Sequence, residues 1–381
     1  MSNAKTARDV SSARRGFLRG SLLLMVPLAL TIFAVPVAAW RSQMPVAHDA
    51  PTINVRDKGA LGDGVHDDTA AIQAAIDALP ASGGTVTIPD GNYMIDAERS
   101  INLRSNTRLQ MTPAATLSGM ANDLDRSYVI KVWRANNVQI IGGRIVGERA
   151  GHRGTTGEWG YGINIQASDN VSVIGTHISD CWGDGIWIGG LGRRANVMVS
   201  TNVTLDHVVS TNNRRQGLSI GPVRGVSVIH STFSNTQGTK PQAGIDIEPQ
   251  GQGPASDITF SDCTITGNQG TGLEIHDNVS GVVVKNCKIQ DNNGYGVLSV
   301  GASQLTISDN LIADNGLAGI VMSSKTSHAR ITGNTLTGNK AKYLRRLVSS
   351  LSSMSVSDRA HNLRIDEGAQ DITVSGNKFQ P

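Results

Sequence analysis

The 381-residue sequence contains 43 glycines, only 4% aromatic residues and a formal net charge of +3. Six basic residues and one acid lie in the first 41 positions, which leaves a net charge of about −2 for the rest. This distribution excludes a nucleic-acid partner, and the near absence of long amphipathic periods excludes a helical protein.

Residues 1–40 have the organisation of a targeting segment. Arg14 and Arg15 precede Phe17-Leu18, and an apolar run follows over residues 21–40. The segment resembles a bacterial twin-arginine export signal, which implies a periplasmic or extracellular protein. The run is also about long enough to span a bilayer, so an uncleaved signal that anchors the protein in the inner membrane remains open. Residues 41–51 are expected to form a linker.

The segment after residue 52 is expected to fold as a strand, a tight turn and a helix. The apolar face of the helix is formed by Ile72, Ala75, Ile76 and Leu79. We assign the acidic group of Asp63, Asp67 and Asp68 to the turn and the helix cap rather than to a metal site. A helix here can close the open end of a repetitive β-structure.

The same segment carries a recognisable motif. It reads G-D-G-x-x-D-D-T-x-x-I-Q from Gly62 to Gln73, followed by G-G-T-V at 83–86 and I-P-x-G-x-Y at 88–93. This motif resembles the amino-terminal cap of the pectate-lyase superfamily. The resemblance implies a right-handed parallel β-helix and a long glycan as ligand, but it does not specify a reaction. The superfamily includes polygalacturonases, polysaccharide lyases, uronate epimerases and phage tailspikes.

Behind the motif, the pattern Gly-apolar-x-apolar recurs seven times between residues 162 and 322, at intervals of 23 to 32 residues. Such a period is typical of a solenoid in which each coil adds one strand to a parallel sheet. We therefore predict an all-β fold, a right-handed parallel β-helix solenoid over residues 52–339 with an N-terminal capping helix. Residues 340–381 are predicted to form a C-terminal cap helix and a last coil.

A second column of polar residues at turn positions supports the repeat. Stacked amides at these positions can hydrogen-bond from coil to coil, so we assign them a structural role. The column consists of Asn212, Thr236, Asn268, Asn292, Asn315 and Asn339.

Two cysteines also occupy matching positions of successive coils. A separation of about 4.8 Å between the coils of Cys263 and Cys287 would allow a disulfide in an exported protein. A zinc site is not predicted, because the chain has no Cys-x-x-Cys or paired-histidine spacing.

The residues between the apolar positions of each strand are predicted to face outward. Two adjacent coils hold Asp246 with Glu248 and then Glu274 with His276 at these positions. Asp246 should neighbour Glu274, and Glu248 should neighbour His276. Carboxylates this close raise the pKa of one of them, which is a property of general acids. We predict these four residues as the catalytic group.

Five further residues are predicted to bind the substrate. Trp187 occupies an outward position, where its ring could stack on a sugar. Arg214 and Arg215 could hold an acidic sugar or balance the carboxylates. Asp184 and Asp277 lie at the border of the group.

These residues favour an exported carbohydrate-active enzyme that cleaves a uronate-containing polysaccharide, either as a lyase or as a glycoside hydrolase. In hydrolysis, Asp246 and a glutamate would share the acid and base roles. In elimination or C5-epimerisation, His276 would be the base. The mannuronan epimerase motif Tyr-Gly-x-Asp-Pro-His-Asp is matched only at Gly244 and Asp246, so the resemblance assigns a role to Asp246 alone.

Three alternatives stay open beside cleavage. The protein could be a polysaccharide C5-epimerase, or a glycan-binding or exopolysaccharide-assembly protein without catalysis. The acidic group could also be a Ca²⁺ site or an ion-paired surface.

Overall fold

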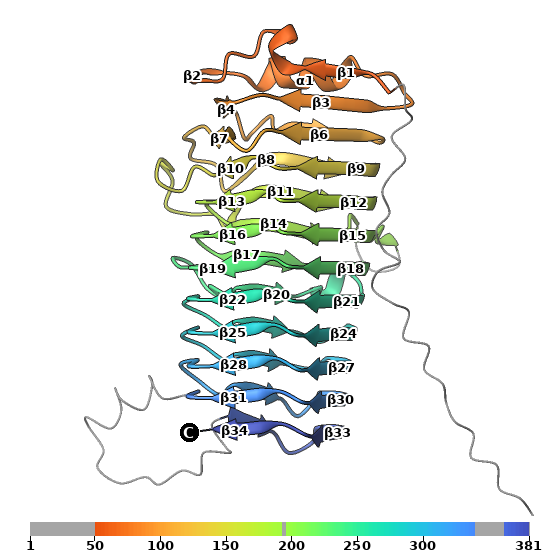
Figure 1. Cartoon of the computed structure of the whole chain (residues 1–381), viewed down its shortest axis with the longest axis vertical. Helices are drawn as coiled ribbons and strands as arrows, with labels where there is room; N and C mark the ends of the chain where they lie inside the picture. Colours follow the sequence, from red (N-terminus) through yellow and green to blue (C-terminus); the bar gives the residue numbers. More distant parts are fainter. Residues whose placement is uncertain (1–49, 193–195, 340–361, 381) are drawn as a thin grey trace, which may run out of the picture. The chain divides into compact units, whose positions relative to one another are not determined.

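The fold is a right-handed parallel β-helix, as the sequence predicted. The structure, a computed structural model, describes residues 50–192, 196–339 and 362–380. Figure 1 shows successive coils stacked from β1 to β34, with each sheet running along the stack. Neighbouring strands of a sheet therefore come from consecutive coils.

Three parallel sheets, which we name A, B and C, form the walls of this stack. Sheet A has twelve strands: β1 (Thr52–Asn54), β3 (Gly84–Ile88), β6 (Thr107–Met111), β9 (Asn136–Ile141), β12 (Asp169–Ile174), β15 (Ser200–Asp206), β18 (Val223–Ile229), β21 (Ala255–Ser261), β24 (Val279–Lys285), β27 (Ser303–Ser308), β30 (Ser327–Thr332) and β33 (Gln370–Ser375). Sheet B also has twelve: β2 (Asp63–Asp67), β4 (Gly91–Ile95), β7 (Ala115–Gly119), β10 (Arg144–Val146), β13 (His177–Ser179), β16 (Val209–Thr211), β19 (Thr232–Ser234), β22 (Thr264–Thr266), β25 (Lys288–Gln290), β28 (Leu311–Ala313), β31 (Thr335–Thr337) and β34 (Lys378–Gln380). Sheet C has ten: β5 (Ile101–Leu103), β8 (Arg126–Trp133), β11 (Trp159–Gln166), β14 (Asp184–Gly189), β17 (Gln216–Ile220), β20 (Ile245–Ile247), β23 (Leu273–Ile275), β26 (Val297–Ser299), β29 (Ile320–Met322) and β32 (Leu363–Ile365).

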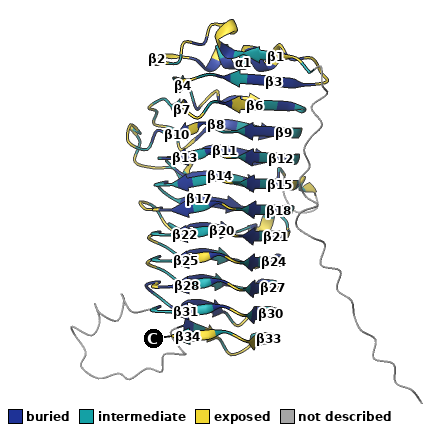
Figure 2. Cartoon of the chain, viewed as in Figure 1, coloured by how far each residue is buried: buried dark blue, intermediate teal, exposed yellow. Residues whose placement is uncertain are grey.

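The core consists of the inward-facing apolar residues of each coil. In β20, for example, Ile245 and Ile247 are fully buried. Ile245 is in register with Leu218 of the preceding coil and Leu273 of the following one. Figure 2 shows the same burial along the strands of the stack. Each coil thus buries one layer of side chains against its two neighbours, which is the main source of stability in a solenoid.

Helix α1 (Thr69–Asp77) closes the N-terminal end of the stack, as predicted (Figure 1). Its residues Ile72, Ala75 and Ile76 are buried, and it contacts β5 and the 3-10 helix Val55–Lys58. This cover matters because the end of a solenoid would otherwise expose apolar core.

The acidic residues before α1 have turn and cap roles. The Asp68 carboxylate accepts the backbone N–H groups of Leu61 and Gly62 at 2.6 and 3.1 Å. The helix cap itself is made by Asp67, whose Oδ1 accepts the backbone N–H of Thr69 at 2.9 Å. The helix-capping side chain is therefore that of Asp67 and not that of Asp68.

The predicted amide column exists, but its member in the coil of β16 is Asn213 rather than Asn212. Asn292 Oδ1 accepts from Asn268 Nδ2 at 2.8 Å, and Asn292 Nδ2 donates to Asn315 Oδ1 at 3.0 Å. Asn213 is fully buried, and its Oδ1 accepts a backbone N–H of the preceding coil at 3.1 Å. Asn212 instead takes the left-handed turn conformation, with φ of 54°. The prediction was wrong by one residue because the turn residue and the column residue are adjacent.

The cysteines are free thiols, so the disulfide that the register allows is not formed. Cys263 and Cys287 do lie on adjacent coils, because the backbone N–H of Lys288 donates to the Cys263 carbonyl at 2.8 Å. The Cys263 thiol contacts the carbonyl of Ser261 at 3.3 Å, and that of Cys287 contacts the carbonyl of Lys285 at 3.2 Å.

Three sequence predictions fall on residues outside the described ranges. They are the export or anchor segment, most of the linker and the helix expected after residue 339. The last coil is described and consists of β32, β33 and β34. Within the described ranges, no helix combines the length and the apolar character that crossing a membrane requires.

Candidate functional site

The outward column predicted on sheet C is present, and it extends further toward the N-terminus than expected. The strand register places Asp246 between Ser219 of β17 and Glu274 of β23, so the predicted neighbours Asp246 and Glu274 do meet. In the other direction the column continues through Trp187 of β14 to Lys131 of β8. One row of side chains therefore runs along sheet C from Lys131 of β8 to Glu274 of β23.

Asp246 is buried, although the sequence predicted that it would face solvent. Asp246 is only 1% exposed because neighbouring side chains cover it. Gln216 Nε2 donates to Asp246 Oδ2, and His276 Nε2 lies 3.3 Å from Asp246 Oδ1. Burial raises the pKa of Asp246; His276 opposes this shift, and the negative charges of Glu274 and Glu248 add to it.

His276 lies between two carboxylates. Its Nε2 is 3.3 Å from Asp246 Oδ1 and 3.3 Å from Glu274 Oε1, and a quarter of the side chain is exposed. Burial alone would lower the pKa of His276, but the two carboxylates raise it to about 10. The ring is therefore protonated at neutral pH. The base role expected for His276 does not fit this environment, whereas the role of a cation or an acid does.

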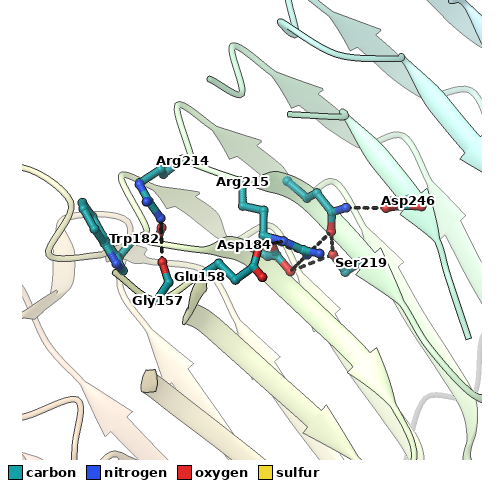
Figure 3. Close-up of polar contacts among 9 residues, drawn as sticks. Gly157, Glu158, Trp182, Asp184, Arg214, Arg215, Ser219 and Asp246 are labelled. Atoms are coloured by element: carbon teal, nitrogen blue, oxygen red, sulfur yellow. Dashed lines mark hydrogen bonds and ion pairs between the residues drawn. The ribbon is translucent and has the colours of Figure 1, made fainter. Parts of the chain in front are cut away.

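A second group of charges, centred on Arg215, lies one coil before Asp246 (Figure 3). Arg215 Nε donates to Glu158 Oε2 at 2.9 Å, while its Nη1 donates to Asp184 Oδ2 at 3.2 Å and to Gln216 Oε1 at 2.8 Å. Gln216 in turn donates to Asp246. The polar contacts therefore continue without a break from one coil to the next, and we call this set the ion network.

Asp184 is the most deeply buried acid of the ion network. Burial raises its pKa to about 6, although Arg215 and the Ser219 hydroxyl, which donates to Asp184 Oδ2 at 2.7 Å, work against this shift. Burial would also lower the pKa of Arg215, but Asp184 and other neighbouring groups raise it. Arg215 is thus already neutralised by the protein itself, and Asp184 is a buried partner rather than a surface contact for substrate.

A cavity of about 290 Å³ opens on sheet C beside the ion network. Its walls combine aromatic rings with charged groups: Tyr128, Trp159, Tyr161, Trp187, Arg126, Arg215 and Glu248. Arg126 lies over the Trp159 ring, with its guanidinium carbon 4.8 Å from the ring centre. Flat rings beside a cation are suited to sugars that carry a negative charge.

Trp187 contributes to this cavity as predicted, and two glycines allow its position. The indole is parallel to the Tyr161 ring, at 6.4 Å between centroids and 5° between planes. It lies over Gly189, where a Cβ atom would approach the Trp187 Cη2 to 2.1 Å, and close to Gly221. Because these positions lack side chains, the ring can lie along the face of sheet C.

Two predicted binding residues are not part of the cavity. Arg214 points away from it and stacks on Trp182, with 3.8 Å between the guanidinium carbon and the ring centre (Figure 3). Arg214 Nη1 also donates to the Gly157 carbonyl at 2.9 Å. Asp277 follows His276 on the exposed surface and takes no part in the contacts described above. We therefore assign Arg214 to structural packing and leave Asp277 outside the site.

Several residues of the site were not predicted from the sequence. Gln216 directly precedes the repeat glycine Gly217 and was not counted as part of its strand. Glu158 and Tyr161 precede the first repeat glycine, and Arg126 belongs to β8, a strand that has no such glycine. A search for alternating apolar residues without the glycine requirement would have found β8, since Ile130 and Val132 alternate there and are both buried.

These features define the class of fold: the chain is a right-handed parallel β-helix protein. A family model described as "Right handed beta helix region" matches residues 239–380, and one described as "Rhamnogalacturonase A/epimerase, pectate lyase-like" matches residues 52–143. Two curated relatives come from Bacillus subtilis (strain 168). The SPbeta prophage-derived protein YorA is 30% identical over 293 residues, covering 67% of this chain and 49% of YorA. YclG is 28% identical over 331 residues, covering 75% of this chain and 55% of YclG. The chain thus spans about half the length of these relatives.

Solved structures with the same fold include an epimerase module, an adhesin and a polysaccharide depolymerase. The A-module of mannuronan C-5 epimerase AlgE6 from Azotobacter vinelandii has a TM-score of 0.64 at 20% identity, covering 86% of this chain and 99% of the module. PfbA, a surface adhesin of Streptococcus pneumoniae, has a TM-score of 0.66 at 19% identity, covering 86% and 90%. Tailspike gp49 from Acinetobacter baumannii bacteriophage Fri1, a capsular polysaccharide depolymerase, has a TM-score of 0.62 at 15% identity, covering 87% and 59%. At these identities the likeness establishes the fold alone.

Proposed function

We propose that the protein is a carbohydrate-active enzyme that cleaves a uronate-containing polysaccharide by elimination at the cavity on sheet C. One observation carries the proposal: an aromatic and cationic cavity lies directly beside an acidic cluster in which His276 lies between two carboxylates. Trp187 and Tyr161 offer flat faces for sugar rings, and Arg126 offers a cation for a uronate carboxylate. The epimerase module and the capsular depolymerase among the structural neighbours support a polysaccharide ligand.

Elimination divides the work among three groups. The sugar loses its C5 proton to a base, the C4–O bond breaks, a C4–C5 double bond forms, and the leaving oxygen takes up a proton. Glu248 lines the cavity and is the candidate base, while the His276 imidazolium is the candidate acid. These two residues directly follow Ile247 and Ile275, which pair across adjacent coils. Arg126 would neutralise the uronate carboxylate and so stabilise the carbanion-like transition state.

Hydrolysis by a carboxyl pair has less support from the site. It requires an acid with a raised pKa in contact with the glycosidic oxygen. The carboxyl groups whose pKa is raised are Asp184 and Asp246, and both are buried among side chains of the ion network. Elimination instead uses Glu248, which lines the cavity, and His276, of which a quarter of the side chain is exposed.

The test is to incubate the full chain with a panel of neutral and uronate-containing glycans and to follow three signals in the same samples. New absorbance from unsaturated uronate is the expected result. New reducing ends without unsaturation would mean hydrolysis, and a changed epimer ratio at constant chain length would mean epimerisation. Either of the last two results would exclude elimination as the reaction. The cavity on sheet C would still be the candidate active site.

Variants connect the activity to the proposed residues. Glu248→Gln and His276→Asn should each reduce turnover by at least about 100-fold, since each removes one proton-transfer group. Glu98→Gln is the matched control, because Glu98 is an exposed glutamate near α1 and far along the chain from the sheet C residues of the cavity. Activity that survives in both site variants would exclude this assignment.

Glycan binding without turnover is the second candidate. It is favoured by the ion network, in which Arg215 and Asp246 already satisfy their charges within the protein. Retention of a uronate glycan by the chain with no chemical change in the glycan would support this function. Loss of that retention in Trp187→Ala would place the binding at the same cavity.

The location of the protein is a separate proposal. Arg14, Arg15 and the apolar run over residues 21–40 support export by a twin-arginine route. Changing both arginines to lysine should leave the protein in the cytoplasm. Unaltered export of that variant would show that the segment directs export by another pathway. Membrane fractionation would show whether the uncleaved segment anchors the protein.

A further inference from the structure

We propose a binding site for a zinc-class transition-metal ion at the turns that join sheet A to sheet B. It is formed by Asp206, His207 and His230. The Nδ1 atoms of His207 and His230 lie 2.6 and 3.2 Å from the same oxygen of Asp206. One donor atom from each of the three residues lies within 4.8 Å of the other two. Imidazole nitrogens with a carboxylate oxygen form a ligand set that Zn²⁺ takes in open sites.

The turn itself does not require these histidines. The register of sheet A places His207 and His230 at a left-handed position, with φ of 54° and 50°. In the other coils that share this register, the same position holds residues that adopt positive φ most easily: Gly142, Gly175, Asp262, Asn286, Asp309, Gly333 and Gly376. The two histidines occur in consecutive coils, where their rings lie 4.7 Å apart.

The exposure of the three side chains suits an ion that also binds water. The side chains of His207, His230 and Asp206 are 65%, 49% and 29% exposed, so one side of the group faces solvent. Ligand atoms about 2.0–2.2 Å from a tetrahedral ion lie about 3.3 Å from one another. The present separations of 2.6 and 3.2 Å between the two Nδ1 atoms and the Asp206 oxygen lie at or below that value. Solvent would fill the remaining coordination positions.

The site is independent of the proposed function, because its residues belong to the turns between sheets A and B whereas the cavity lies on sheet C. The proposal departs from the expectation that the chain has no zinc site. The two histidines are one coil apart, so they meet in space although their sequence spacing matches no short metal motif. An ion held by two coils should stabilise the folded chain, since it binds the folded state and not the separated residues.

The test is zinc titration of the full, tag-free chain, read by calorimetry and by the melting temperature. We expect binding of one Zn²⁺ ion at this site and a rise in Tm of several degrees at saturating zinc. Co²⁺ in place of Zn²⁺ should give visible absorption from a site with nitrogen and oxygen ligands. The double variant His207→Asn/His230→Asn should lose this binding by at least about 100-fold, because it removes two of the three protein ligands.

The control is His328→Asn, which removes another exposed histidine that has positive φ and a carboxylate neighbour, Asp371, at 3.3 Å. It should bind zinc as the unchanged chain does. Asparagine already occupies the equivalent turn as Asn286, so the double variant should fold, and His207→Gly/His230→Gly provides a second version if it does not. Zinc binding that is absent from the unchanged chain, or that persists in the double variants, would overturn the proposal.

Discussion

Two stacks of polar side chains run along this β-helix, and they differ in composition. The amide column repeats one neutral residue, as in Asn268, Asn292 and Asn315, and each amide hydrogen-bonds to the next coil. The column on sheet C changes its residue at every coil and contains buried charge. Its central members are Asp246 and Glu274, joined by His276.

The difference shows which stack serves the fold. A buried neutral amide with all its hydrogen bonds formed is stable and can be repeated without cost. Buried carboxylates are costly, and burial raises the pKa of Asp184 and Asp246 for the same reason. The coils on the C-terminal side hold Leu298 and Val321 in the same column, so a coil does not need charge there. This contrast supports a functional role for the charged part of sheet C.

The largest effect should come from placing a carboxylate on the inward face of β20. Ile245→Asp turns a charge into the core, whereas the natural Asp246 lies on the opposite face of the strand beside His276. We expect a loss of at least about 4 kcal/mol in the free energy of unfolding, enough to prevent folding. Circular dichroism and urea denaturation measure the change, with Ile245→Val as control at about 1 kcal/mol. A folded Ile245→Asp chain of normal stability would contradict the core assignment.

Interrupting the amide column should be the next largest change. Asn292→Ala removes the hydrogen bonds to Asn268 and Asn315 and leaves the Ile265 carbonyl without the amide that donates to it at 3.1 Å. We expect a loss of about 3 kcal/mol, because several buried polar groups lose partners together. The neighbouring exposed residue provides the control: Asn293→Ala should change stability by less than about 0.5 kcal/mol. Equal effects of the two variants would mean that the column is not structural.

Neutralising the charged column should have the opposite effect on stability. Asp246→Asn keeps the shape of the side chain and removes a carboxylate whose pKa is raised by burial. We expect a Tm that is equal or higher, together with a loss of any glycan turnover, because His276 loses one of its two carboxylate partners. Glu274→Gln should behave in the same way. A lower Tm accompanied by loss of bound calcium would instead show that the acidic group is a structural metal site.

The pH dependence of stability offers the finest test of the charged column. The pKa of His276 is raised to about 10 in the folded chain from an ordinary value of 6.5. Its contribution to stability is therefore complete below about pH 6.5 and disappears as the pH rises through about 10. Thermal melts between these pH values should show a steeper loss for the unchanged chain than for His276→Asn. Parallel curves would mean that the carboxylates do not hold the proton on His276.

The repeat determined most of the fold, and the coil register followed from it. Because each coil adds a constant rise, residues at the same place in the Gly-apolar-x-apolar pattern share a row. This is why the sequence alone pairs Asp246 with Glu274 and places Ile245 and Ile247 in the core. The cap motif around Gly62 predicted α1 for a similar reason, since a solenoid end must be covered.

The tertiary structure decided what each row does. Gln216 covers Asp246, and Arg215 turns toward Asp184 while Arg214 turns toward Trp182. None of these contacts follows from the period, because they depend on side-chain rotamers and on turns of unequal length between the strands. Periodicity specifies which residues are neighbours along the stack. The burial and the charge of each side chain depend on the groups packed around it, and only the folded chain brings those groups together.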